Sequence, residues 1–293
     1  RIILVEKTDF NPEAWRDQIQ RYPGLESLFD DVEVIYRYDR TIPVEVNPDD
    51  AFVATSCWTA HIANHALKQL KRDSFTFLVQ DYEPVFVPMN SVHALFSEAY
   101  TFPQYNLFST GLLRDYFRLN QIGIYADSAA YGDERSTAFE NAIYKATVDG
   151  AALRRERKRL LFYARPEPHA ARNMFELGML SLIEAVRSGE FDVSKWSFHG
   201  IGSIDMNVRL ELAPDVELQL VPRSSPQQYV EMLPTFDVGL SLMLTPHPSL
   251  VPLEMASAGM WTVTNSYANK TRDKLEAISS NLIVAEPTIS GIK

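Results

Sequence analysis

The feature that most constrains the fold is the alternation of short β-branched or aromatic runs with longer amphipathic segments. This alternation is typical of repeated strand–helix units, in which helices connect parallel strands. We expect strands at residues 2–5, 32–36, 52–55, 75–79, 106–109, 123–125, 160–164, 195–200, 216–220, 238–243, 262–265 and 282–284. We expect helices at residues 12–20, 59–71, 92–99, 112–119, 134–145, 172–187, 226–233, 250–258 and 271–278. The pattern predicts an α/β protein with parallel sheets.

The length of 293 residues corresponds to two domains at roughly 150 residues each. A turn signal at Asp149-Gly150 and a basic run at 154–159 place the boundary between Thr147 and Lys158, giving units 1–150 and 151–293. The basic run is either a solvated linker or a patch for nucleic acid or a membrane. We favour the linker, because the chain as a whole carries a net charge of −10.

Composition excludes several classes of protein. The chain has one cysteine, Cys57, so no intrachain disulfide can form, and a reducing compartment is the default. With 28 basic and 38 acidic residues, it lacks the basic character of a nucleic-acid-binding domain. No apolar run approaches the ~20 residues that a membrane span requires. We expect a cytoplasmic protein without a nucleic-acid partner.

One polar segment follows a predicted strand directly. Gln80-Asp81-Tyr82-Glu83-Pro84 comes after residues 75–79, at the strand end where open parallel sheets bind ligands. Two carboxylates beside a tyrosine suit acid–base chemistry or the binding of sugar hydroxyls. The alternative is a capped turn before Pro84, which favours an extended Glu83.

A second polar segment begins a predicted helix. Ser249 is a good N-cap for a helix that starts at Leu250, and the exposed N–H groups of such a helix start can bind phosphate. Glu254 lies one turn further along, where it could accept hydrogen bonds from ribose hydroxyls. A second helix start at Ser225-Pro226 follows Arg223, which could neutralise a diphosphate. The alternative is two well-capped helices and an exposed arginine.

Two weaker signals stay open. His61 and His65 have a spacing that can hold zinc, but the glutamate of a zinc-protease helix is missing and no third ligand is evident, so ordinary helical histidines are favoured. The segment 199–203, His-Gly-Ile-Gly-Ser, either approaches a phosphate or sugar closely or makes a tight strand exit.

Several segments together resemble a known family. Residues 248–259, Pro-Ser-Leu-Val-Pro-Leu-Glu-Met-Ala-Ser-Ala-Gly, are similar to the donor-site helix of family 4 GT-B glycosyltransferases. Residues 53–60, 80–84, 161–166 and 237–243 resemble the bacterial rhamnosyltransferases of the rhamnan-synthesis type, as do Arg172-Asn173, Phe175-Glu-Leu-Gly178, Thr264-Asn265 and Asn269-Lys270. The likeness runs from about residue 50 to the end of the chain.

This resemblance implies two Rossmann-like, doubly wound domains that face a cleft. The C-terminal domain would bind a nucleotide sugar, dTDP-L-rhamnose in the first instance, and the N-terminal domain a glycan or lipid-linked saccharide acceptor. Glu254 would bind the ribose, while Arg165, Arg172 and Arg223 would lie at the diphosphate and Ser249 and Leu250 at the nucleotide. Asp81 and Glu83 are candidate catalytic residues, and Gln80, Tyr82 and Trp58 are candidates for contacting the sugar or acceptor.

The resemblance further implies transfer with retention of anomeric configuration, with no metal and no cofactor besides the donor. A peripheral contact with the inner face of the membrane stays open. Two departures stand out. Pro246 occupies the position of the first glutamate in the family's Glu-seven-residues-Glu motif, and the family's first strand–helix unit and closing C-terminal helices would lie outside the chain. The alternatives are a transferase of UDP- or GDP-sugars, an epimerase or phosphorylase on the same scaffold, and a non-catalytic nucleotide- or glycan-binding protein.

Overall fold

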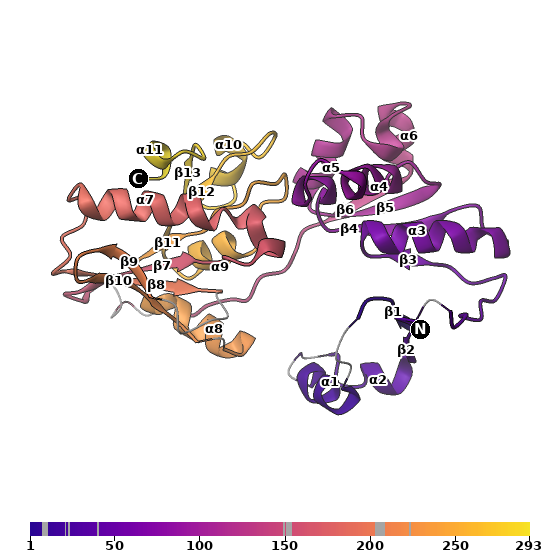
Figure 1. Ribbon diagram of the computed structural model, residues 1–293, viewed down its shortest axis with the longest axis horizontal. Helices are drawn as coiled ribbons and strands as arrows, with labels where there is room; N and C mark the ends of the chain where they lie inside the picture. The colour runs from indigo at the N-terminus through magenta and orange to yellow at the C-terminus, as the bar shows by residue number, and fades with distance from the viewer. Residues whose placement is uncertain are drawn as a thin grey trace.

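The computed structural model describes residues 1–293 except 8–10, 21, 23, 40, 149, 151–153, 203–208 and 223. In the described residues, the strands form sheets of two, four and seven strands, and every strand pair but one is parallel. The four- and seven-stranded sheets belong to the two bodies on the right and left of Figure 1. The predicted α/β class with parallel sheets is confirmed.

The N-terminal part contains the two smaller sheets. β1 (Ile2–Leu4) pairs with β2 (Val34–Tyr36), and α1 (Pro12–Ile19) and α2 (Leu28–Asp31) lie between them in the chain. The larger sheet runs in chain order through β3 (Val53–Ala54), β4 (Phe75–Val79), β5 (Gln104–Ser109) and β6 (Ser136–Phe139). Its connections contain α3 (Cys57–Ala66), η1 (Leu67–Gln69), η2 (Glu83–Phe86), α4 (Ser91–Ala99), α5 (Gly111–Leu119), η3 (Gly123–Tyr125) and α6 (Ala129–Glu134).

The core of the four-stranded sheet is aromatic. Phe77 and Phe108 are fully buried in neighbouring strands, and the rings of Tyr100 and Phe117 pack between them and the helices. Because alternate side chains of a strand point to opposite faces, β4 buries its first, third and fifth residues here. Because β4, β5 and β6 pair in parallel, their carboxyl ends lie at one edge of the sheet.

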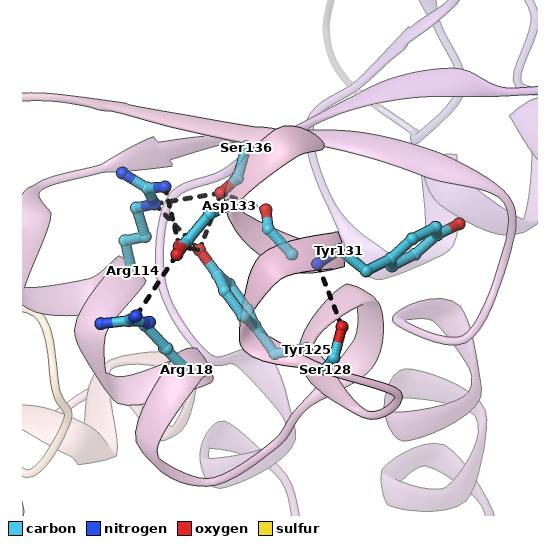
Figure 2. A network of polar contacts seen from close by, with 8 residues as sticks. Arg114, Arg118, Tyr125, Ser128, Tyr131, Asp133 and Ser136 are labelled. Carbon is cyan, nitrogen blue, oxygen red and sulfur yellow. Dashed lines mark hydrogen bonds and ion pairs between the residues drawn. The ribbon is translucent and has the colours of Figure 1, made fainter.

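Two predictions in this part are wrong. Residues 134–145 do not form a helix, since 136–139 form strand β6, and residues 123–125 form the short helix η3 in place of a strand. A polar network explains this arrangement (Figure 2). The guanidinium of Arg114 donates to the Tyr125 hydroxyl at 2.9 Å, the Ser136 hydroxyl at 3.0 Å and the Asp133 carboxylate at 3.1 Å. These bonds tie η3, α6 and β6 to helix α5, and so attach β6 as the edge strand.

The C-terminal part is a doubly wound sheet with the order β13-β12-β11-β7-β8-β10-β9. Its strands are β7 (Lys158–Tyr163), β8 (Trp196–Ile201), β9 (Leu210–Ala213), β10 (Val216–Leu220), β11 (Val238–Leu240), β12 (Trp261–Asn265) and β13 (Leu282–Ala285). Its helices are η5 (Pro168–Asn173), α7 (Phe175–Arg187), α8 (Pro226–Met232), η6 (Leu233–Thr235), α9 (Val251–Ser257), α10 (Arg272–Glu276) and α11 (Ile289–Ile292). The strand order reverses between β7 and β11, and a ligand crevice is expected there. Strand β9, antiparallel to β10, was not predicted.

Strand β7 shows how helices cover both faces of this sheet. Leu160 and Phe162 belong to the core beneath α7 and α11, whereas Leu161 belongs to the core beneath α8 and α9. Figure 1 shows α7 on one side of the sheet and α8 and α9 on the other. Gly178 of α7 lies against Phe162 so closely that an added Cβ would meet the ring at 2.4 Å. Met179 and Leu182 of α7 belong to the same core as Phe162.

The basic run at 154–159 is built into the fold. Arg155 donates to the Thr235 carbonyl, and Arg159 lies over the Phe236 ring with its guanidinium carbon 4.3 Å from the ring centroid. Lys158 is 3.3 Å from Asp237. The interpretation as a solvated linker is therefore wrong for these side chains. They attach the amino end of β7 to the residues that directly precede β11. The domain boundary between Thr147 and Lys158 remains a prediction.

None of the helices in the described part of the chain has the length and apolar character needed to cross a bilayer.

Candidate active site

A cavity of about 490 Å³ lies where the carboxyl ends of the two larger sheets meet. From the N-terminal sheet it is lined by Asp81 after β4, Ser109 at the end of β5 and Asn141 after β6. From the C-terminal sheet it is lined by Tyr163 at the end of β7 and by His247, in the connection that follows β11. The cavity therefore lies beside the reversal point between β7 and β11, as expected for this type of sheet.

Asp81 is the buried carboxylate of this cavity. Its Oδ1 accepts a hydrogen bond from the Tyr82 N–H at 2.8 Å, and its side chain is close to the Thr245 hydroxyl. Burial raises the pKa of Asp81 to about 6, although Arg172 and Lys270 lower it by their charge. A carboxyl group with this pKa can accept or release a proton near neutral pH.

The imidazole ring of His247 contacts residues of both domains. Its Nδ1 accepts a hydrogen bond from the Ser249 N–H at 2.9 Å, and its Nε2 lies 3.4 Å from the Ser109 hydroxyl and 3.1 Å from the Asn141 amide. Burial lowers the pKa of His247 to about 4, and the charges of Lys270 and Arg172 act in the same direction. The imidazole is therefore neutral at pH 7 and acts as a hydrogen-bonding bridge between the domains.

Lys270 holds the connection between β11 and α9. Its ammonium group has no exposed surface and donates to the carbonyls of Met243 at 2.7 Å and His247 at 3.4 Å. Asn265 binds the same connection, since its Oδ1 accepts from the Met243 N–H at 2.7 Å. Burial lowers the pKa of Lys270 to about 7, opposed by the nearby charge of Asp81. These two side chains fix the position of His247.

Arg172 lines the same cavity. Its guanidinium lies over the Phe86 ring, 4.5 Å from the centroid, and donates to the His169 carbonyl at 3.1 Å. Its buried Nε has no hydrogen-bond partner among the described residues. Since an arginine carries five N–H donors, Arg172 keeps several for a ligand.

A second cavity, of about 480 Å³, adjoins the first and shares Tyr163 and Val251 with it. It is lined by two predicted donor-site residues, Arg165 and Glu254. Burial raises the pKa of Glu254, whose carboxyl group faces the Tyr229 hydroxyl. The two predicted residues therefore lie at one cavity, at the carboxyl ends of β7 and β8.

Arg165 is held in place by three neighbours. It donates to the Glu167 carboxylate at 2.9 Å and the Tyr163 hydroxyl at 3.1 Å, and lies 3.2 Å from the His169 ring nitrogen. Gly202 lies against it with φ of +102°, where a Cβ would meet Arg165 at 2.7 Å. In the segment 199–203, the glycine at 202 is therefore needed for a close approach beside this cavity, whereas Ser203 lies outside the described residues.

Two other predicted residues line the first cavity but form hydrogen bonds with the backbone of the protein. Gln80 and Glu83 line it, but Gln80 is exposed and donates to the Thr55 carbonyl at 3.0 Å. Both oxygens of Glu83 accept from the Cys57 N–H, at 3.2 and 3.0 Å. Glu83 thus caps the first turn of α3. This structural role accounts for a glutamate at this position without a catalytic role. Its catalytic role stays a prediction, and Asp81 is the stronger candidate.

Tyr82 and Trp58 do not line either cavity. The Tyr82 ring packs among Tyr100, Tyr116 and Phe117, with centroid distances of 5.6 Å. Trp58 is 39% exposed and packs edge-on against Phe96 on the side of α3 and α4. Both aromatic rings stabilise the N-terminal core, and nothing in these contacts favours binding of an acceptor.

The predicted helix starts differ in detail. Ser249 is not an N-cap, because its φ of +66° turns the chain ahead of Leu250 and its own N–H is bonded to His247. Leu250 occupies the cap position without a side-chain bond, and it lines the first cavity together with Ser249. Ser225 is the N-cap of α8, with a reciprocal bond to Gln228. Arg223 lies outside the described residues.

The histidines on α3 have ordinary surroundings. The His61 Nε2 atom lies 2.8 Å from the Leu95 carbonyl, and its ring packs edge-on against Phe102. In the parts of the chain that the structure describes, no group of three His, Cys, Asp or Glu side chains could hold a metal ion.

Sequence reasoning missed His247, Asn141, Ser109 and Lys270 as site residues. Two signals were present. His247 stands between two prolines directly after a predicted strand, and Ser109 ends a predicted strand. Asn141 was hidden by the wrong helix at 134–145. The complete burial of Lys270 depends on the path of the connection that it binds, which the sequence does not reveal.

Two α/β domains with facing carboxyl edges and a cavity between them define the class, since this is the GT-B fold. The family comparison agrees in both halves. Residues 2–109 match the family described as WsaF, N-terminal domain, and residues 158–293 match WsaF, C-terminal domain. The two matches follow one another in this order along the chain.

Individual relatives are more distant. The O-antigen biosynthesis protein RfbC of Myxococcus xanthus is 28% identical over 84% of the chain, which spans only 18% of that protein's length. HepE of Anabaena, solved in complex with UDP and glucose, has a TM-score of 0.60 at 12% identity and is matched over 99% of this chain and 86% of its own. Sucrose-phosphate synthase of Thermosynechococcus elongatus has a TM-score of 0.58 at 8% identity, over 97% and 69%. The structural matches confirm the predicted fold.

Proposed function

We propose that the chain is a glycosyltransferase of surface-polysaccharide biosynthesis, acting in the cytoplasm. It passes a deoxyhexose, L-rhamnose from dTDP-L-rhamnose, to a glycan or lipid-linked saccharide with retention of configuration. The observation that carries the proposal is the pair of adjoining cavities, with Glu254 and Arg165 in one and Asp81 and Arg172 in the other. The name of the RfbC relative and the UDP and glucose bound to HepE support the same reading.

The nucleoside end of the donor occupies the cavity of Glu254. Two vicinal ribose-type hydroxyls, or the single one of a deoxyribose, can donate to this carboxylate, whose burial strengthens such bonds. Tyr229, which faces the same carboxyl group, provides a flat wall for the nucleoside. Gly202, which has no Cβ, leaves room for the Arg165 side chain at this cavity.

The diphosphate lies between Arg165 and Arg172, where the two cavities meet. Negative charge develops on the leaving diphosphate as the glycosidic bond breaks, and fixed guanidinium groups stabilise it in proportion to their preorganisation. Arg165 is preorganised by its bonds to Glu167 and Tyr163. This charge compensation is why we expect turnover without a divalent metal, and activity that survives addition of EDTA will test it.

The transferred sugar lies in the cavity of Asp81. The carboxylate accepts a hydrogen bond from a hydroxyl of the sugar or of the acceptor and so positions it for transfer. Asn141 and His247 border the same space from the two domains. Because Pro246 stands where family 4 has its first glutamate, we assign the carboxylate role at the sugar to Asp81.

The testing experiment is calorimetric titration with dTDP, UDP and GDP. Wild-type protein should bind dTDP most tightly, and Glu254→Ala should lose at least tenfold in affinity, while Glu211→Ala on edge strand β9 should bind as wild type. Arg165→Gln should weaken dTDP but not thymidine, because it removes only a diphosphate contact. Failure of the folded protein to bind any of the three nucleotides would overturn the proposal.

One observation favours a second candidate, a non-catalytic nucleotide-binding protein of the same fold. Pro246 is buried and offers no carboxylate where family 4 transferases have one. The two functions separate in one assay. Release of dTDP from dTDP-rhamnose in the presence of an acceptor supports the transferase, whereas tight nucleotide binding with no turnover of dTDP-, UDP- or GDP-sugars supports the binding protein.

A further inference from the structure

A third cavity, of about 720 Å³, lies on the seam between the domains beyond His247. Its walls carry aliphatic side chains from both sides of the seam, namely Leu112, Ile143, Pro248, Leu250, Leu253 and Ile278. We call this space the aliphatic groove. Its volume is within the ~300–1,000 Å³ of small-molecule sites. Ile278 is 52% exposed, so the groove is accessible from solvent.

The aliphatic groove continues from the cavity of Asp81. The two share Asn141 and Leu250 in their walls. The nucleotide cavity adjoins the Asp81 cavity through different residues, Tyr163 and Val251. The three spaces therefore form a row, with the proposed reacting sugar in the middle, the nucleotide at one end and the aliphatic groove at the other. A molecule that reaches Asp81 through the groove enters from the acceptor side.

The chemistry of the groove differs from that of its neighbours. Its lining contains no aromatic ring, whereas Tyr163 and Tyr229 line the nucleotide cavity and Phe86 the Asp81 cavity. Flat aromatic faces suit sugar and base rings, whereas branched aliphatic side chains suit a flexible hydrocarbon.

The polar side chains of the groove already have protein partners. The Asp115 carboxylate lies 3.6 Å from the Lys274 ammonium across the seam, and Glu140 accepts from the Gly111 N–H at 2.9 Å. The Asn141 amide lies 2.7 Å from the Ser109 hydroxyl. The surface left for a ligand is therefore mainly hydrocarbon, and its affinity comes from burial of apolar area.

We propose that the aliphatic groove binds an alkyl or isoprenoid chain attached to the acceptor saccharide, next to the sugar that receives the transferred residue. The inference rests on the proposed function and narrows its acceptor to a saccharide with a hydrocarbon aglycone. Leu112 and Ile143 contact the chain from the N-terminal side, and Leu253 and Ile278 from the C-terminal side.

The test is binding of methyl, butyl and octyl rhamnosides, and of the matching glucosides, by calorimetry below the micelle concentration. Each methylene that is buried lowers Kd by up to about fourfold. We expect octyl glycosides to bind at least tenfold more tightly than methyl glycosides with either sugar. Equal affinity of the octyl and methyl compounds would overturn the inference.

Variants locate the effect. Ile278→Asn and Ile143→Asn should remove the gain of the octyl chain but leave the Kd of the methyl glycoside and of dTDP unchanged. Ile289→Asn, at a 39% exposed isoleucine on α11, is the matched control and should keep the gain. Urea titration checks that both groove variants are folded. If the octyl chain still increases the affinity of both folded variants, the inference is overturned.

The outcome is distinguishable from failure of the proposed function. Loss of nucleotide binding refutes the donor site, whatever the alkyl series shows. Normal nucleotide binding without a chain-length effect refutes the aliphatic groove alone. The protein could also bind vesicles of phosphatidylglycerol equally well with and without Ile278→Asn, and show no chain-length effect with the glycosides. That result would assign the hydrocarbon contact to another surface and overturn the inference.

Discussion

The Ser249 N–H donates to Nδ1 of His247 at 2.9 Å, so the neutral imidazole must carry its proton on Nε2. That N–H can donate to the Ser109 hydroxyl of the other domain, 3.4 Å away. Protonation of His247 would place a second proton at Nδ1, against the Ser249 N–H. The Ser249 hydrogen bond that orients the ring toward the other domain is therefore compatible only with neutral histidine.

This relationship predicts that the folded protein loses stability in acid. The pKa of His247 is lowered from 6.5 to about 4, so between these values the unfolded chain binds more protons than the folded chain. The free energy of unfolding should fall as pH drops from about 6.5 to about 4, with about 1–3 kcal/mol from His247. Urea titrations at pH 7.5, 6 and 5 should show a shallower fall in His247→Asn. The exposed His65→Asn is the control, and an unchanged slope in His247→Asn would contradict the assignment.

Asp81 should control the pH dependence of turnover. With a pKa of about 6, its carboxylate form predominates above that pH, so the rate should decline as pH falls through 6. We expect Asp81→Asn to lose at least a hundredfold in kcat, within the ~10²–10⁴ range of acid–base and hydrogen-bonding groups, while the Kd of dTDP stays within threefold. Asp127→Asn, at an exposed site of the same domain, should retain the wild-type profile. Unchanged turnover in Asp81→Asn would remove this residue from the reaction.

Lys270 should make the protein more stable in mild alkali. The pKa of Lys270 is lowered from 10.5 to about 7 in the folded protein. Between these pH values the unfolded chain binds one more proton at Lys270 than the folded chain, so the free energy of unfolding rises with pH. From pH 7 to 9 the gain is up to about 2–3 kcal/mol. Lys270→Met should abolish this rise in urea titrations, whereas the exposed Lys68→Met should keep it. A rise of equal size in Lys270→Met would show that another group titrates.

Gly178 should tolerate no side chain. A Cβ at this position would lie 2.4 Å from Cζ of the buried Phe162. Gly178→Ala should lower the free energy of unfolding by about 1–3 kcal/mol through overpacking, despite the better helix propensity of alanine. Thermal unfolding followed by circular dichroism measures the loss. Gly150→Ala, where nothing lies within 4 Å, should be near neutral, and equal melting temperatures for both variants would contradict the packing argument.

The sequence allowed much of the fold to be predicted, because strand–helix units carry their signal locally. Residues 75–79 and 216–220 form strands with the predicted bounds. The exceptions depend on distant contacts. The segment 134–145 has helical composition, but the bonds of Arg114 to Tyr125 and Ser136 attach it as an edge strand. Local propensity is overridden by such tertiary contacts.

The candidate site divides in the same way. Asp81 and Glu254 were identifiable because each stands at or near an element end where ligands bind, and the structure places both at cavities. His247 and Lys270 escaped because their roles arise where two domains and a long connection meet. Ser249 was misjudged for a related reason, since it has a φ of +66° and bonds His247 through its own N–H in place of capping the helix.

The position of β7 also governs how the chain folds during synthesis. Residue Leu160 of β7 pairs with Phe198 on one side and with Val238 on the other. The first partner is synthesised soon after β7, but the second comes about twice as far along the chain. Until β11 emerges, one flank of an apolar strand has unpaired N–H and C=O groups and can recruit a strand from another nascent molecule. The strand order itself thus leaves this flank of β7 open to mispairing until Val238 has been synthesised.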